Sequence, residues 1–159
     1  MTRRLPKYPF MLVCMIAPLV LADASMAAET SQPMRSGGME IFFGVIPAEI
    51  LLGHPDTHEE RRMHGGAPSR KGQHHLIVSV FDGTTRERIA NAAVTARVGE
   101  IGLSVQEKKL ELMQFAGTAT YGNYFTMAAP GPYRVELEIR RSGDRQQVKT
   151  SFVYSHPRR

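Results

Sequence analysis

Five of the six histidines lie in one short stretch of the chain, between His54 and His75. The same stretch contains Met63 and three carboxylates. Imidazole, thioether and carboxylate groups are the side chains that bind borderline and soft transition metals. The stretch shows little hydrophobic patterning, so packing in a core does not explain its composition. The pattern therefore indicates a metal site, although it matches no metal signature of fixed spacing.

We expect the ion to be bound by this loop, by the strand that follows it and by one later methionine. His54 and His58 are four residues apart, but Pro55 disfavours the helix that would bring them onto one face. On an extended strand His74 and His75 point to opposite faces. His75 lies on the face that carries fewer apolar side chains. The alternative is a solvated loop whose histidines bind nothing. The candidate metal ligands are His54, His58, Met63, His64, His75 and Met113.

Met113 joins this set because of its place in a strand that we predict over residues 108–115. Along that strand it shares a face with Lys109 and Glu111, so the face is mostly polar. A thioether on a polar face is available as a metal ligand. Filling of an irregular core is the other common use of methionine, and it stays open as the alternative.

The first 28 residues are typical of a cleavable export signal. They combine a cationic start, an apolar run over residues 10–21 and small residues up to Ala28. The apolar run is too short to span a bilayer comfortably, so we expect cleavage near Ala28 and a periplasmic mature protein. Cys14, the only cysteine, lies inside this signal. Its removal excludes thiolate metal sites, cysteine nucleophiles and disulfides.

The composition indicates neither a nucleic-acid-binding protein nor an enzyme. Removal of residues 1–28 takes three of the 20 basic and one of the 15 acidic residues, which lowers the formal net charge from +5 to +3. Such a mild charge specifies no partner, and no aromatic-basic nucleic-acid motif is present. No serine or threonine lies in a recognisable activating motif, so we expect a protein without enzymatic activity.

The rest of the chain is typical of an all-β protein. After a flexible lead over residues 29–38, short strands alternate with turns, and the clearest apolar–charged alternation covers residues 133–140. A polar loop over residues 53–73 carries the histidine cluster, and residues 48–52 are expected to continue the first strand after a bend. No segment has the pattern of an amphipathic helix. These features predict a single immunoglobulin-like antiparallel β-sandwich over residues 39–156, with strands at 39–46, 74–81, 94–98, 108–115, 123–127, 133–140 and 148–154.

Several short motifs match one known family. They are Met39-Glu40-Ile41, Met113, Thr120-Tyr121-Gly122-Asn123, Met127 and Gly131-Pro132-Tyr133-Arg134-Val135. On these residues the chain resembles the bacterial periplasmic iron-transport proteins. The resemblance implies an immunoglobulin-like sandwich with a copper site of methionine and histidine ligands. It also implies that Met113 is the methionine ligand, and that the protein serves ferrous-iron uptake beside a membrane permease.

Two positions depart from that family, and a second family is also similar. Thr120 stands where the family has a histidine ligand, and residues 140–147 lack the histidine of the family's final hairpin. The motifs at residues 80–82 and 89–94 resemble those of YtkA-like exported domains, which are sandwich modules too. Together the two resemblances imply the fold more strongly than any activity.

The sequence therefore predicts an exported, non-enzymatic accessory of a membrane metal-uptake system that binds copper or ferrous iron. Neutral imidazoles and a thioether would capture the ion reversibly, and protonation near the ordinary histidine pKa of about 6.5 would release it. The partner would be an inner-membrane metal permease or an envelope protein and not a nucleic acid, and a homodimer is left open. The alternative is a metal-free immunoglobulin-like module that docks an envelope or membrane partner.

Overall fold

Strands dominate the part of the chain that the computed structural model describes, which is residues 33–53, 65–66, 68–115 and 117–156. The residues of the expected export signal lie outside these ranges. Within them, no helix has the length and apolar character needed to cross a membrane. In chain order the elements are β1 (Met34–Ser36), β2 (Met39–Pro47), α1 (Ala48–Leu52), β3 (Gln73–Asp82), β4 (Ala92–Glu100), β5 (Gln106–Phe115), β6 (Thr118–Thr126), β7 (Gly131–Arg141) and β8 (Val148–His156).

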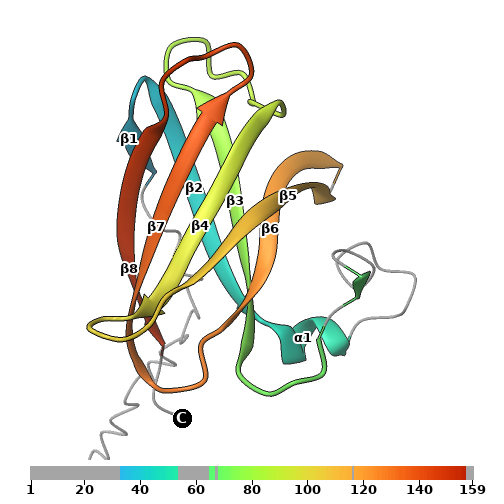
Figure 1. The fold of residues 1–159 in the computed structure, drawn as a ribbon. Coiled ribbons are helices and arrows are strands. Elements are labelled where there is room, and N and C mark those ends of the chain that lie inside the picture. The colour runs from blue at the N-terminus through green and yellow to red at the C-terminus, as the bar shows by residue number, and fades with distance from the viewer. Residues whose placement is uncertain (1–32, 54–64, 67, 116, 157–159) are drawn as a thin grey trace, which may run out of the picture.

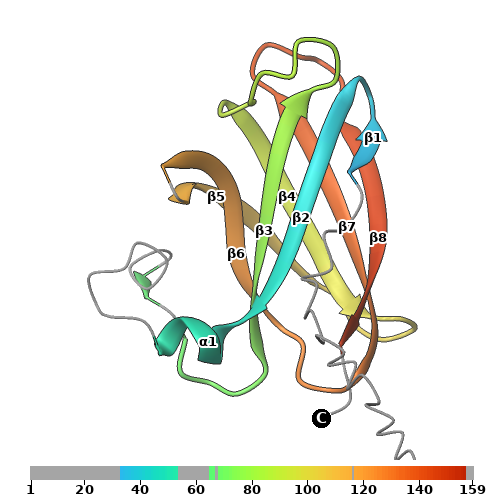
Figure 2. The same cartoon turned by 180° about the vertical axis from the view of Figure 1, so that it is seen from behind.

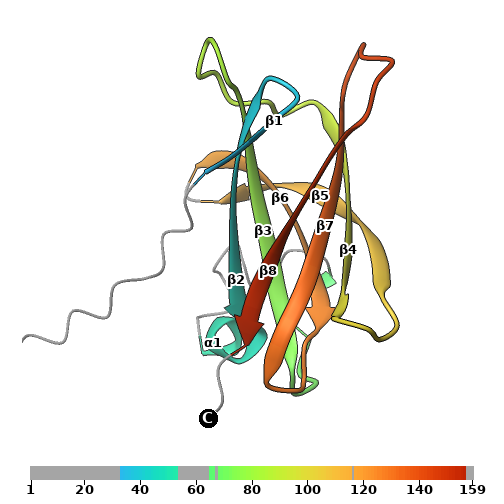
Figure 3. The ribbon, with the colours of Figure 1, turned by 90° about the vertical axis from the view of Figure 1, so that its left-hand side faces the viewer.

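The strands form two layers that are joined through β5 (Figure 1, Figure 3). The hydrogen-bonded order is β1-β2-β3-β6-β5-β4-β7-β8, and all the pairs are antiparallel. β5 pairs with β4 through residues 106–110 and with β6 through residues 111–115. It therefore runs from one layer into the other and makes the eight-stranded sheet barrel-like. The prediction of an all-β, immunoglobulin-like antiparallel sandwich is confirmed.

The core lies between the layers and follows from the alternation of side chains along the strands. In β7, Val135, Leu137 and Ile139 are fully buried, whereas Arg134 and Arg140 on either side of them are exposed. The apolar side chains belong to one buried cluster that draws on both layers. Full burial of each such side chain contributes about 1.5–3 kcal/mol, so the alternation fixes which face of every strand turns inward.

The two edge strands of this order, β1 and β8, approach each other. Ser36 Oγ donates a hydrogen bond to the carbonyl oxygen of Lys149 at 3.5 Å. The rings of Phe43 in β2 and Phe152 in β8 also stack, with their centroids 3.3 Å apart. We call this contact region the seam. Side-chain contacts across the seam thus join the two layers on the side opposite β5.

Three local features differ from the sequence prediction, and one of them is the start of β6 at Thr118, where the prediction began a strand at residue 123. Ala48–Leu52 forms the helix α1 and does not continue β2. Pro47 has a φ of −57°, and the fixed φ and missing N–H of proline suit the start of a helix. The helix buries Ala48 and Leu51 at one end of β2 (Figure 2). Met34–Ser36, inside the predicted flexible lead, forms β1 because it pairs with β2.

Tyr121 ties the connection between β3 and β4 to the core. Its hydroxyl donates to the carbonyl oxygen of Ile89 at 2.9 Å and accepts from the N–H of Ala92, also at 2.9 Å. The residue is almost fully buried, and this burial raises the pKa of the hydroxyl. A neutral hydroxyl therefore serves as donor and acceptor at once, and two backbone groups depend on it.

Tyr121→Phe should lower the free energy of unfolding by about 1–3 kcal/mol, because the change leaves a buried carbonyl and a partly buried N–H without partners. The ring itself stays, so packing is nearly unchanged. Urea unfolding followed by circular dichroism measures the effect. A variant as stable as the wild type would show that other groups or water satisfy Ile89 and Ala92.

Asp82 organises the turn that follows β3. Its Oδ1 atom accepts N–H bonds from Thr85 at 3.0 Å and from Thr84 at 2.9 Å. Its Oδ2 atom accepts a bond from Arg141 Nη1 at 2.7 Å. The two backbone bonds, followed by the arginine, lower the pKa of the carboxyl group from 3.8 to about 2. The carboxylate thus links the β3–β4 turn to the end of β7.

The contribution of Asp82 to stability should disappear in acid. Folding lowers this pKa, so the contribution is complete above about pH 4 and is lost as the pH falls toward about 2. Asp82→Asn should therefore melt at a lower temperature than the wild type at neutral pH, and the two melting temperatures should converge in strong acid. Thermal melts across this pH range provide the measurement, with Glu87→Gln at an exposed neighbouring position as the control. A gap that stays constant with pH would contradict this role.

Candidate metal centre

Three neighbouring strands bring an imidazole and a thioether together on the outer face of one layer. His75 lies in β3, Met113 lies in β5, and Gly122 of β6 lies between them. A Cβ atom added at Gly122 would lie 2.7 Å from His75 Nε2 and 3.0 Å from Met113 Sδ. Both distances are measured to one point, so the nitrogen and the sulfur are close neighbours above the glycine. We call these two side chains the His75–Met113 pair.

The register of the sheet explains this convergence. Gly122 pairs with Ile77 of β3 on one side and with Glu111 of β5 on the other. His75 and Met113 are each two residues from those partners, and side chains two residues apart on a strand share a face. Both are therefore diagonal neighbours of Gly122, at a separation that long side chains bridge. The glycine has no side chain, so the space above it is left to them.

The His75–Met113 pair is shielded from bulk water. His75 is 0% exposed and Met113 is 7% exposed. The ring of Tyr124 stacks on the His75 imidazole, with centroids 4.7 Å apart and planes at 26°. Tyr124 packs in turn against Ala48 and Leu51 of α1. The short helix thus covers one end of the site, a role that the sequence did not reveal.

Thr120 adds a buried hydroxyl group to the same face. It lies directly opposite Met113 in the β5–β6 ladder, and directly opposite residues place their side chains on one face. Thr120 is 3% exposed, and within the described part of the chain its Oγ1 atom has no hydrogen-bond partner. Such a buried polar atom costs about 1–3 kcal/mol when it stays unsatisfied. The hydroxyl therefore suits a water molecule or an ion beside the His75–Met113 pair.

The structure brings together two of the six ligands predicted from the sequence, His75 and Met113. Within the described ranges, no group of three or more His, Cys, Asp and Glu side chains is arranged to hold a metal ion. Among the described residues, the two side chains thus supply one nitrogen and one sulfur donor. The other four predicted ligands lie outside the described residues: His54, His58, Met63 and His64.

Gly122 and Tyr124 shape the candidate site, and the sequence analysis did not assign either residue to it. A glycine inside a strand often marks a close approach of other groups, and Gly122 is flanked by Tyr121 and Asn123 in the middle of β6. The strand predicted from the sequence begins at residue 123, so Gly122 falls outside it and this signal is missed. No pattern in the sequence identifies Tyr124 as the stacking partner of His75, because that contact depends on the pairing of the two residues across β3 and β6.

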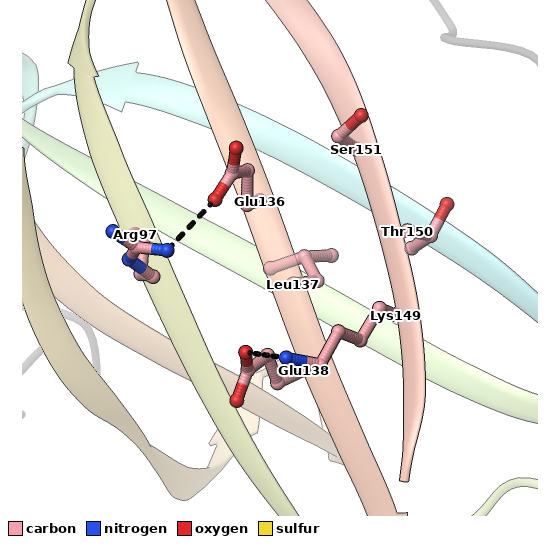
Figure 4. A pocket seen from close by; sticks show the side chains of 7 residues that line it. All are labelled: Arg97, Glu136, Leu137, Glu138, Lys149, Thr150 and Ser151. Carbon is pink, nitrogen blue, oxygen red and sulfur yellow. Dashed lines mark hydrogen bonds and ion pairs between the residues drawn. The ribbon is translucent and has the colours of Figure 1, made fainter.

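A polar pocket also lies on the outer face of the other layer, between β4, β7 and β8 (Figure 4). Arg97 pairs there with Glu136 at 3.3 Å, and Lys149 pairs with Glu138 at 2.7 Å. The hydrogen bond from Lys149 is the main cause that lowers the pKa of Glu138. These charges compensate one another across neighbouring strands. The pocket therefore offers a ligand no excess charge, in contrast to the donor atoms over Gly122.

The fold and the site together define a class of protein, an antiparallel β-sandwich that holds a buried imidazole and thioether on the outer face of one layer. A scan of the chain against protein-family models finds no match, and neither does a search of curated proteins. Solved structures, in contrast, are similar along most of the chain.

Three of these structures represent the similarity. Copper-reconstituted P19 from Campylobacter jejuni matches 80% of this chain and 94% of its own, with a TM-score of 0.59 and 12% identity. FetP from uropathogenic Escherichia coli matches 81% and 96%, with a TM-score of 0.57 and 17% identity, and a variant of FetP is copper-bound. A DUF4426 family protein from Pseudomonas aeruginosa matches 79% and 96%, with a TM-score of 0.58 and 14% identity. The TM-scores show a shared fold, and at that level they confirm the resemblance indicated by the sequence.

Gly122→Ala should lower the free energy of unfolding by about 1–3 kcal/mol, because an added methyl group overpacks the site. The new Cβ would lie within 3.0 Å of both His75 and Met113. Gly44 in β2 is the matched control, because a Cβ there would meet no atom within 4 Å. Gly44→Ala should leave stability unchanged or slightly raised. If chemical unfolding shows the two variants to be equally stable, the space above Gly122 is not filled as described.

Proposed function

We propose that the protein is a non-enzymatic metal-binding protein of the periplasm that captures copper or ferrous iron for a membrane metal-uptake system. The convergence of His75 Nε2 and Met113 Sδ above Gly122 is the observation that carries this proposal. The two donors come from different strands of one rigid sheet and are packed on several sides. Donors that are held in place before the ion arrives bind it with little loss of conformational entropy.

The types of donor favour copper over other ions. A thioether is a soft ligand that suits Cu(I), and imidazole suits copper, iron and zinc. Magnesium and calcium would need a shell of oxygen ligands, whereas the described site offers the Thr120 hydroxyl beside nitrogen and sulfur. We therefore assign copper first and ferrous iron second.

Two side chains leave most positions around an ion open. We assign further positions to the loop that follows α1, because its side chains have the same chemistry as the His75–Met113 pair. The chain enters that loop next to the site, since Leu51 of α1 packs on Tyr124 and Tyr124 stacks on His75. The ligands assigned from the loop are His54, His58, Met63 and His64.

The comparisons and the sequence support the same proposal. P19 and FetP, which share the fold, have been obtained with copper bound. Met113 matches the methionine ligand of the resembling family, whereas Thr120 replaces one of its histidines. The expected export signal accounts for a periplasmic location, and an inner-membrane permease is the partner that would take up the captured ion.

Met113→Leu should weaken Cu(I) binding by about 10- to 100-fold, because it removes the thioether while it keeps nearly the same volume. Met127→Leu is the matched control, because Met127 is fully buried in the core cluster between the layers. Competition with a Cu(I) chelator under anaerobic conditions measures both affinities. His75→Gln should behave like Met113→Leu.

Equal copper affinities for Met113→Leu and Met127→Leu would exclude the His75–Met113 pair as the metal site. Failure of the wild-type protein to take up either copper or ferrous iron would exclude the function itself.

A metal-free docking module is the second candidate, and a separate observation favours it. The connection between β4 and β5 exposes three large apolar side chains, Ile101, Leu103 and Val105, which are 51%, 64% and 48% exposed. Exposed apolar groups in close succession suit contact with a protein or membrane partner. This candidate predicts that serine at these three positions abolishes association with the partner, whereas Met113→Leu leaves that association unchanged.

A further inference from the structure

A second pair of imidazoles lies on the other side of β3 from the His75–Met113 pair. His74 is 2% exposed and turns toward the inside of the sandwich. It meets His156, the half-buried last residue of β8, with ring centroids 4.8 Å apart and ring planes at 89°. β3 belongs to one layer and β8 to the other, so this contact bridges the layers at one end of the molecule.

The backbone determines which nitrogen of each ring carries the proton. His74 Nδ1 lies 3.3 Å from the carbonyl oxygen of Gly72, and His156 Nδ1 lies 3.1 Å from the carbonyl oxygen of Ala129. A carbonyl oxygen can only accept a hydrogen bond, so both Nδ1 atoms are the protonated ones. In each neutral ring the lone pair is therefore on Nε2. Histidines that bind metals through Nε2 show the same anchoring of Nδ1 by a carbonyl or carboxylate.

The distance between the rings also fits a shared ion. With metal–nitrogen distances of about 2.0–2.1 Å and a tetrahedral angle, two imidazoles on one ion have ring centroids about 5 Å apart. The observed 4.8 Å agrees with this value. The ring planes are perpendicular, so the two rings do not stack on each other.

We propose that His74 and His156 form a second metal site, selective for a borderline divalent ion such as zinc. Its protein donors are two nitrogens, whereas the His75–Met113 pair includes a sulfur, so the two sites prefer different ions. Water or an external ligand completes the coordination. The site does not depend on the proposed function, because adjacent residues of a strand serve opposite faces of the sheet.

A bound ion would join the two layers at this end of the sandwich. His74 is fixed in β3 and His156 in β8, so the ion binds the folded state and not the unfolded chain. Binding of that kind raises the melting temperature in proportion to the logarithm of ion concentration above the dissociation constant. A rise in melting temperature with zinc therefore tests this site in addition to a count of the bound ions.

The test uses the full mature chain with four of the six ligands proposed for the first site removed. His54, His58 and His64 are changed to Asn and Met113 to Leu, and zinc is titrated by calorimetry and by thermal melting. This background should bind a single zinc ion and melt at a higher temperature with zinc. His156→Asn in the same background should weaken zinc binding by about 10- to 100-fold and abolish the rise in melting temperature. Ser155→Asn, which introduces the same residue at the exposed neighbouring position, should change neither.

Nitrogen NMR of the wild-type histidine rings provides the second measurement. Zinc should shift the Nε2 signals of His74 and His156. Unmoved signals, or zinc affinity that His156→Asn leaves unchanged, would overturn the second site. Loss of copper binding in Met113→Leu with zinc binding retained separates this site from the proposed function, and either one can fail without the other.

Discussion

The pairing of β6 with β3 on one side and with β5 on the other is the constraint on which the candidate site depends. It places Gly122 between two strands whose side chains point the same way, so that His75 and Met113 meet over a residue without a side chain. β5 can take part because it leaves β4 after Leu110 and joins β6 from Glu111 onward. A shift of one residue in either ladder would turn one donor to the opposite face of the sheet.

Much of this arrangement follows from alternation that is visible in the sequence. The pattern of Tyr133, Val135, Leu137 and Ile139 predicts a strand with one buried face, and β7 has that face in the core. The same parity rule separates His74 from His75 and puts Met113 on the outer face. Sequence analysis therefore identified two donors that the fold brings together, although they are far apart along the chain.

Other features depend on tertiary contacts that no local pattern encodes. α1 is too short for helical periodicity to appear, and Leu51 is buried because Tyr124 of β6 lies against it. The fact that β5 has two partners cannot be read from its own residues, because the pairing depends on which segments lie beside each half of the strand. His156 looks solvated in a basic terminal segment, and its contact with His74 arises only because the start of β3 and the end of β8 lie at the same end of the sandwich.

The seam between β1 and β8 has a consequence for the behaviour of the molecule in solution. An unpaired sheet edge is a template onto which a strand of another chain can add, which leads to polymers. Here the three-residue β1 and the lysine-bearing β8 face each other across the Ser36–Lys149 hydrogen bond and the stacked rings of Phe43 and Phe152. Each edge strand thus covers the other. The sheet is protected from pairing with strands of another molecule, although β1 and β8 do not pair to close a barrel.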